Sequence, residues 1–436
     1  MKSNYALSVK GKLLGIINEM SANKQEYVVN PEKDFTRDRK LPFATMLQTI
    51  FSMGGQSIRK ELLTRLGFST ETPTASAFVQ QREKILPAAF EHAFQAFTGT
   101  LPTYKRYKGY RLLAVDSSDV PITYDPYDDE TYLRRNAGYR GCSQYHLIAM
   151  YDLCNKIYTD ALVHTVRNRN EFGGMVDLVR RCGDFEKIIL ADRGFASFNV
   201  FANLHEHGCK YVVRVHEAFK RTIFSKWPLP KEEDEFDVQI TRQLTYRQTK
   251  LELSQPDVFY PIGSPRFDFL DEERVYYPFS VRIVRFRLPS GDLQAVATNL
   301  PANKFPSEAL KEIYHMRWGI ETSFRLLKHN LGLPYFHAKK RPSILQEIFS
   351  KLTMFNFCSS IIENTAKAKD GKKHPHIPNF AVASYLCMAF LRGMLADEAI
   401  LDSLLNMHSI PVRKNRRCRR PKSNPRHPIS FDYRFA

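Results

Sequence analysis

Three carboxylates in this sequence stand where a fold could bring them to one site. Asp116 and Asp192 each follow a short apolar run, at 111–115 and 187–191, and Glu321 lies in a stretch with helical periodicity. Mg²⁺ and Mn²⁺ prefer oxygen ligands of this kind and keep other positions open for water and phosphate. Two such ions can hold the attacking and leaving oxygens of a phosphodiester displacement. The acids therefore predict metal-dependent chemistry on a phosphodiester, with water or a DNA 3′-hydroxyl as the attacking group.

The stretch 306–330, which carries Glu321, predicts a helix with two different faces. At about 100° per residue, one band roughly 60° wide holds four side chains: Tyr314, Arg317, Glu321 and Lys328. An apolar stripe on another side would bury the helix, and it consists of Ile313, Met316, Ile320, Phe324 and Leu327. Lys328 lies about 10 Å beyond Glu321, a spacing that suits a nucleic-acid backbone better than a small ligand. The alternative is an ordinary Arg317–Glu321 pair on a solvated face.

Composition favours a polyanionic partner. Lys and Arg outnumber Asp and Glu by 64 to 46, a formal net charge of +18 over 436 residues. Such an excess points first to nucleic acid and second to an anionic membrane surface. No apolar run approaches the about 18 residues of a membrane span, and the N-terminus lacks a signal-like apolar core, so we expect a soluble cytoplasmic protein. The seven scattered cysteines predict neither a disulfide framework nor a zinc site.

The elements around the two aspartates predict an α/β domain. Residues 106–216 read as strand, strand, strand, helix, strand, helix, strand, which describes a mixed sheet with a βαβ crossover. Ligands collect at the carboxyl ends of strands in such sheets, where we expect Asp116 and Asp192. The alternative for each is a turn or capping aspartate. We expect Asp119 to be such a residue, in the loop after the strand.

The regions around this domain differ in character. Residues 1–105 predict short helices, which could include a DNA-reading helix-turn-helix or form a plain bundle. Residues 217–292 predict a β-rich insertion, and 293–345 return to the sheet and end with the Glu321 helix. Residues 346–410 predict a helical C-terminal region. The basic tail, 411–436, is expected to bind phosphates without sequence preference.

Three blocks of the sequence resemble a known family. They read Ala-Val-Asp116-Ser-Ser-Asp-Val-Pro-Ile, Leu-Ala-Asp192-Arg-Gly-Phe and Tyr314-x2-Arg317-x3-Glu321-x6-Lys328. In this order they resemble the catalytic blocks of bacterial insertion-sequence transposases with a DDE triad, in the subgroup with a Tyr-Arg-Glu-Lys signature. The resemblance spans about 110–330 and includes a long β-rich insertion before the glutamate. One departure is Ser in place of the Gly that often follows the first Asp in this family.

The resemblance implies a fold and roles for single residues. It implies a ribonuclease-H-like catalytic domain in which Asp116, Asp192 and Glu321 bind Mg²⁺, with Mn²⁺ as a substitute. Tyr314, Arg317 and Lys328 would hold DNA phosphates near the cleaved end.

Two tryptophans outside this set have expected roles. Some relatives stack a flipped base on an aromatic residue of the insertion, a role open to Trp227, although packing within the insertion is the favoured alternative. Trp318 is expected to pack against the sheet.

The predicted function is DNA transposition. The chain would bind terminal inverted repeats in double-stranded DNA, cut to free a 3′-hydroxyl and join that end to target DNA. The resemblance implies cut-and-paste transposition, a homodimer in the synaptic complex, and action at the bacterial nucleoid without a membrane. Two alternatives remain: a metal-dependent nuclease of the same fold without strand transfer, and a noncatalytic DNA-binding regulator.

Overall fold

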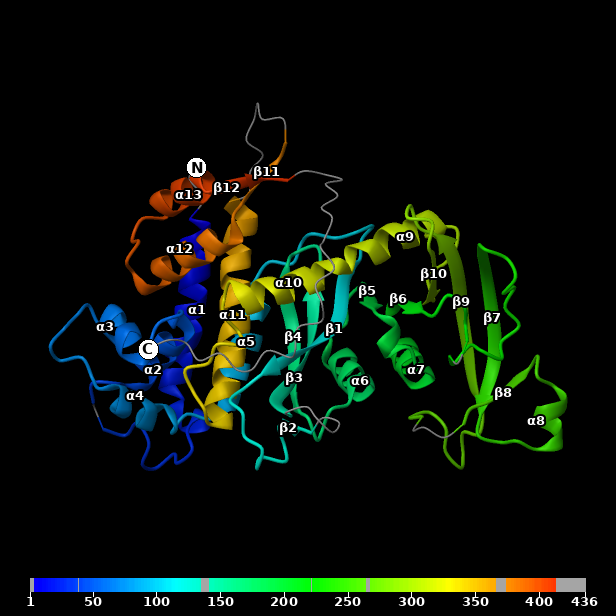
Figure 1. Cartoon of the computed structure of the whole chain (residues 1–436), viewed down its shortest axis with the longest axis horizontal. Coiled ribbons are helices and arrows are strands. Elements are labelled where there is room, and N and C mark those ends of the chain that lie inside the picture. Colours follow the sequence, from blue (N-terminus) through cyan, green and yellow to red (C-terminus); the bar gives the residue numbers. More distant parts are fainter. Residues whose placement is uncertain are drawn as a thin grey trace.

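The computed structural model describes residues 4–37, 39–134, 141–220, 222–263, 267–365 and 374–412. A helical region stands at one side of a mixed sheet, and the sheet extends away from it to strands at the opposite end (Figure 1). Among the described residues, no helix is long and apolar enough to cross a membrane. The basic tail beyond Val412 lies outside these ranges, so its predicted phosphate binding stays a prediction.

The helical region combines both ends of the chain. Its N-terminal helices are α1 (Tyr5–Ala22), the 3₁₀ turn η1 (Lys24–Tyr27), α2 (Phe43–Ser52), α3 (Ile58–Arg65), α4 (Ala75–Arg82) and α5 (Pro87–Thr100). Its C-terminal elements are α11 (Arg341–Thr365), α12 (Phe380–Arg392), α13 (Glu398–Met407) and the small strands β11 (His376–Pro378) and β12 (Ser409–Pro411). Single side chains explain where some of these helices begin. The Thr74 hydroxyl accepts a hydrogen bond from Ala77 N before α4, and Pro87 is the first residue of α5. The apolar helix α11 is buried between these groups.

The described residues form one sheet of 10 strands. The strands are β1 (Arg111–Pro121), β2 (Tyr132–Leu133), β3 (Cys142–Asp152), β4 (Ile157–Thr165), β5 (Lys187–Ala191), β6 (Lys210–Val215), β7 (Phe236–Thr245), β8 (Phe259–Pro261), β9 (Tyr277–Arg287) and β10 (Leu293–Thr298). Their order is β2-β3-β1-β5-β6-β10-β9-β7-β8, and β4 also pairs with β3. This confirms the predicted mixed α/β class.

Two crossover helices connect the parallel strands. Strands β1, β5 and β6 run parallel, with α6 (Glu171–Arg181) before β5 and α7 (Phe198–Glu206) between β5 and β6. Side chains along β1 alternate between faces, so Leu113 and Val115 join the core under α6 and α7. Leu112 and Ala114 join the core with the helical region. By the same alternation Asp116 faces the helical side and Asp119 faces α6.

The stretch 217–292 extends the main sheet. Its strands β7 and β9 pair with each other, and β9 pairs with β10, which in turn pairs with β6. The short helix α8 (Lys250–Ser254) begins with a capping box between Thr249 and Glu252. The stretch is therefore rich in strands, and these strands continue the sheet that carries the two aspartates.

Two local expectations were wrong. Strand β1 does not end at Asp116 but continues to Pro121, and Asp119 lies in it opposite His146 instead of in a loop. Cross-strand hydrogen bonds to the long strand β3 outweigh the turn propensity of the Ser-Ser-Asp segment. The expected single helix at 306–330 is two helices, α9 (Ser307–Met316) and α10 (Trp318–His329). They are separated only by Arg317, whose backbone is still right-handed helical (φ −51, ψ −33).

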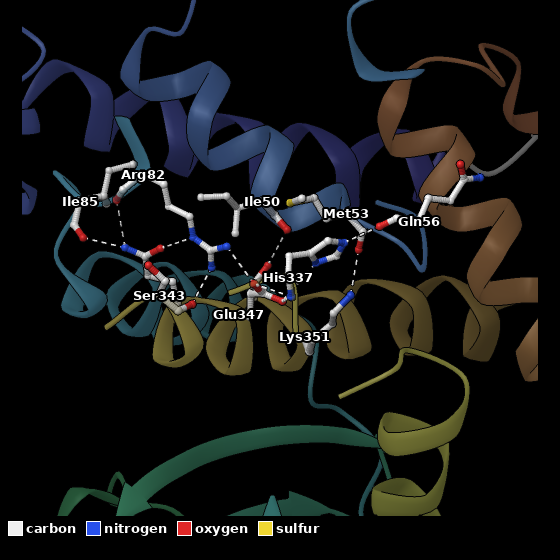
Figure 2. A network of polar contacts seen from close by, with 11 residues as sticks. Ile50, Met53, Gln56, Arg82, Ile85, His337, Ser343, Glu347 and Lys351 are labelled. Carbon is white, nitrogen blue, oxygen red and sulfur yellow. Dashed lines mark hydrogen bonds and ion pairs between the residues drawn. The ribbon is translucent and has the colours of Figure 1, made fainter. Parts of the chain in front are cut away.

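A buried polar network joins α4 to α11 (Figure 2). The guanidinium of Arg82 donates to Gln346 Oε1 at 2.7 Å, to Glu347 Oε1 at 2.8 Å and to the Ser343 carbonyl. Burial alone would raise the pKa of Glu347, but Arg82 and hydrogen bonds from His337 outweigh it and hold this pKa well below its usual range. The network therefore ties the N-terminal helices to the C-terminal ones.

Removing Arg82 should destabilise the protein strongly. In Arg82→Met, Glu347 stays buried without its cation, so the free energy of unfolding should fall by about 3–5 kcal/mol. The double variant Arg82→Met/Glu347→Leu should recover much of this loss, because no uncompensated charge remains. Urea unfolding measures both, and equal destabilisation of the single and double variants would contradict the role given to this ion pair.

Candidate active site

Arg317 connects two of the three predicted acids. It stands between α9 and α10 with an almost fully buried side chain. Its Nη2 donates to Glu321 Oε1 at 2.6 Å, and its Nη1 lies 3.6 Å from Asp116 Oδ2. The i, i+4 pair expected as an alternative is thus present, but its guanidinium is buried and also contacts a strand, while the Glu321 side chain remains 36 % exposed.

Asp116 lies in the field of the other two acids. Its Oδ1 accepts the backbone N–H of Ser117 at 2.8 Å. The pKa of Asp116 is raised to about 6, first by burial and then by the charges of Glu321 and Asp192, while the Ser117 N–H and Arg317 act in the opposite direction. The structure therefore brings all three carboxylates into one neighbourhood, although they come from β1, the end of β5 and α10.

Asp192 follows β5 directly, at the strand end where the sequence places it. The Tyr314 hydroxyl donates to its Oδ1 at 3.2 Å, and Arg214 Nη1 lies 3.9 Å from the same oxygen. Burial raises the pKa of Tyr314, so its phenol is a neutral donor. Arg214 was not predicted, and its signal in the sequence is a charged residue inside the otherwise apolar end of β6. Tyr314 is buried and holds a carboxylate in this conformation, and its predicted contact with a DNA phosphate stays a prediction.

Lys328 ties α10 to β1. Its Nζ donates to the backbone carbonyl of Asp119 at 2.9 Å, and burial lowers the pKa of Lys328. The conformation described here therefore has Lys328 bound to protein at the position where the sequence predicts a phosphate contact.

A second polar cluster adjoins the acids on the α6 side of the sheet. Asp119 Oδ1 lies 2.8 Å from His146 Nδ1, and Arg169 Nη2 donates to Glu171 Oε1 at 2.9 Å. The Ser117 hydroxyl donates to the same Glu171 oxygen at 3.1 Å. Sequence patterns did not single out His146, Arg169 or Glu171, because their proximity depends on strand register and on the start of α6.

The two tryptophans differ from each other in exposure. Trp227 is only 2 % exposed and packs among the rings of Phe198, Phe224 and Tyr260, which corresponds to the packing alternative and leaves no face for a base. Trp318 is 54 % exposed, so the expectation that it packs against the sheet was wrong. It begins α10 on the outer side, where Arg317 lies 5.9 Å from its ring centre.

The acids are neighbours without forming a closed ligand shell. Among the residues that the structure describes, no group of three or more His, Cys, Asp or Glu side chains is assembled to hold a metal ion. Arg317 occupies the place between Asp116 and Glu321 and supplies the positive charge there.

Comparison with known proteins identifies the family. The model of the family described as "Transposase DDE domain" matches residues 107–357. No curated protein matches the sequence. The chain is similar to the structure titled "Cryo-EM structure of piggyBac transposase synaptic complex with hairpin DNA", with 10 % sequence identity and a TM-score of 0.48 over 93 % of this chain and 85 % of that chain. The family match spans more than half of the 436 residues, and the chain therefore belongs to the transposase DDE domain family.

Proposed function

We propose that this chain is a transposase that cuts DNA at the ends of a mobile element and joins the freed 3′ end to target DNA. Asp116, Asp192 and Glu321 are the acids on which both steps depend. The observation that supports this most directly is the convergence of the three acids around Arg317, where burial, and after it the charges of Glu321 and Asp192, raises the pKa of Asp116 to about 6. Perturbed carboxylates of this kind are concentrated at functional sites.

The chemistry of the acids fits a divalent cation. Each of the three keeps part of its side chain exposed, and together they offer only carboxylate oxygens, which suit Mg²⁺ with Mn²⁺ as a substitute. When bound, such an ion supplies Lewis acidity toward phosphate oxygens and activates the attacking water or hydroxyl. Arg317 provides positive charge between Asp116 and Glu321, and Tyr314 holds the orientation of Asp192.

The strand order supports a ribonuclease-H-like catalytic domain. The antiparallel strands β4, β3 and β1 are followed by the parallel strands β5 and β6, with α6 and α7 as crossovers. On this interpretation 106–216 and 293–345 form the catalytic domain, and 217–292 is an insertion that lengthens its sheet. The helical regions 1–105 and 346–410 then flank it.

Double-stranded DNA is the proposed partner, at the element ends and at the target. The net charge of +18 supports a polyanion, and Arg193 and Arg214 stand beside Asp192 in sequence or in space. Recognition of terminal inverted repeats, a cut-and-paste route, a homodimeric synaptic complex and action at a bacterial nucleoid rest on the resemblance of the three sequence blocks.

Replacing Glu321 tests the function itself. Glu321→Gln keeps size and removes the charge, so Mg²⁺-dependent cleavage of the DNA that flanks the gene should be abolished while band-shift binding persists. Glu308→Gln, at an exposed acid of α9, is the matched control and should cleave normally. Cleavage by Glu321→Gln at the wild-type rate would refute the assignment.

Two further outcomes separate the alternatives. Wild-type protein that cuts plasmid DNA but never joins it would be a nuclease. Binding without any cleavage under Mg²⁺ or Mn²⁺ would indicate a regulator.

Asp116 predicts a specific pH dependence of stability. The pKa of Asp116 is raised from 3.8 to about 6 in the folded protein, so protonation of this carboxyl favours the folded state. This stabilisation is complete below the ordinary pKa of Asp116 and is lost as the pH rises through about 6. Without metal, Asp116→Asn should therefore stabilise the protein at neutral pH, by at most roughly 3 kcal/mol, and should flatten this part of the profile of melting temperature against pH. Mg²⁺ should stabilise the wild type more than Asp116→Asn. A less stable Asp116→Asn at neutral pH would contradict the raised pKa of Asp116.

Tyr314→Phe separates positioning from DNA contact. The variant loses only the hydroxyl that donates to Asp192 Oδ1. We expect the cleavage rate to fall by about tenfold to a hundredfold, as for other residues that orient a metal ligand, with DNA affinity and its salt dependence unchanged. Single-turnover cleavage and binding at several salt concentrations measure the two effects. A smaller salt dependence with an unchanged rate would instead make Tyr314 a phosphate contact.

A further inference from the structure

Glu171 connects the two segments of the chain that carry the aspartates. It is the first residue of α6, and its side chain is 28 % exposed. Its Oε1 accepts the Ser117 hydroxyl of β1 at 3.1 Å. Its Oε2 lies beside the other segment, because a Cβ added to Gly194 would be 3.9 Å from it. Gly194 belongs to the 3₁₀ turn η2 (Arg193–Phe195), which directly follows Asp192. One side chain of α6 therefore reaches both segments.

Ser117 links Glu171 to Asp116. The backbone N–H of Ser117 donates to Asp116 Oδ1 at 2.8 Å, and its hydroxyl donates to Glu171. Successive side chains of a strand face opposite sides of the sheet, so Glu171 acts on Asp116 through Ser117. A glycine at position 117 would keep the N–H but lack the hydroxyl. The contact with α6 therefore depends on the serine of this chain.

The start of α6 is held close to the sheet. The Asn170 side chain accepts a hydrogen bond from Gly173 N at 2.8 Å and so caps the helix. A Cβ at Gly174 would clash with Ile148 Cδ1 on β3, so this glycine allows the first turn of α6 to lie against the strand. Phe195 of η2 is only 2 % exposed and belongs to the apolar core that α6 covers. The first turn of α6 and the turn after Asp192 are therefore fixed relative to each other.

Two further side chains hold the Glu171 carboxylate. Arg169 Nη2 donates to its Oε1 at 2.9 Å, and His146 Nε2 lies 3.2 Å from the same oxygen. Both also contact Asp119 on β1, at 3.4 Å from Arg169 Nη1 and 2.8 Å from His146 Nδ1. A glutamate at the first position of a helix is favoured by the helix dipole alone. That simpler role would not require Ser117 and His146, which reach the carboxylate from two strands.

We propose that Glu171 is a positioning residue that acts through Ser117 and sets the orientation of Asp116 relative to Asp192. The proposal rests on the proposed function, because it treats both aspartates as ligands of a divalent cation. Without the hydrogen bond to Glu171, the segment of β1 at 116–117 would be less firmly held relative to η2. An ion would then meet a less ordered pair of ligands, and the loss of such supporting contacts typically weakens metal binding by about tenfold to a hundredfold.

Binding of Mn²⁺ to the full-length protein, measured by electron paramagnetic resonance of the free ion, tests this without relying on cleavage. Glu171→Ala and Ser117→Ala should each weaken Mn²⁺ binding by about tenfold. The double variant should bind no more weakly than the weaker single variant, because both changes remove the same hydrogen bond. Glu171→Gln keeps an oxygen that can accept from Ser117 and should retain most of the affinity.

Asp177→Ala is the matched control. It removes an exposed acid from the same helix, about 9 Å further along the axis, and should bind Mn²⁺ as the wild type does. Melting temperatures without metal report on folding. If Glu171→Ala proves unstable, Ser117→Ala, which removes a single hydroxyl, still decides the question.

Several results would overturn the proposal. They are a wild type that binds no Mn²⁺, wild-type affinity in Ser117→Ala, and additive losses in the double variant. Glu171→Gln that binds as weakly as Glu171→Ala would also overturn it, because the charge of Glu171 would then bind the ion directly.

Failure of the proposed function is a separate result. If Glu321→Gln still cleaves DNA, the transposase assignment falls, but a shared loss of Mn²⁺ affinity in Glu171→Ala and Ser117→Ala still supports the positioning role. If Glu321→Gln fails to cleave while these two variants bind Mn²⁺ normally, the function stands and the positioning role falls.

Discussion

The candidate site depends on a buried cation among like charges. Arg317 is hydrogen-bonded to Glu321 and lies within ion-pair distance of Asp116, and Asp192 contributes to the same field. A buried guanidinium is costly without partners, and so is a cluster of carboxylates without a cation. Each therefore stabilises the other. Burial, and after it the charges of Glu321 and Asp192, still raises the pKa of Asp116 to about 6, so further positive charge beside Asp116 would be favourable.

The position of Arg317 follows from the packing around it. Ile313 and Ile320 are fully buried on either side of the junction between α9 and α10, so the chain cannot rotate without exposing them. A Cβ at Gly319 would lie 2.7 Å from Leu153 Cδ2, so the glycine allows α10 to approach the end of β3 closely. The apolar stripe and one glycine thus determine where the charged face of the helix stands relative to Asp116.

The sequence predicted features that depend on local patterns. The mixed α/β class, the position of Asp192 after a strand and the apolar stripe with Ile320 each follow from periodicity, and the structure has them. Features that depend on pairing between distant segments were missed. The length of β1 is set by β3, which draws Asp119 into the sheet. Trp227 is buried by rings from other elements, which its neighbours in sequence do not reveal.

The three residues predicted to contact DNA are bound to protein atoms in this structure, which affects how DNA can bind. Tyr314, Arg317 and Lys328 all donate hydrogen bonds to protein atoms in this conformation, so a phosphate contact at any of them would replace one of these bonds. A DNA backbone that approaches the three carboxylates brings further negative charge to a site that is already acidic. A divalent cation removes that repulsion, and phosphate oxygens in turn complete the coordination of the cation. Under the proposed function, binding of DNA and of metal should therefore be coupled, each increasing the affinity for the other by the same factor.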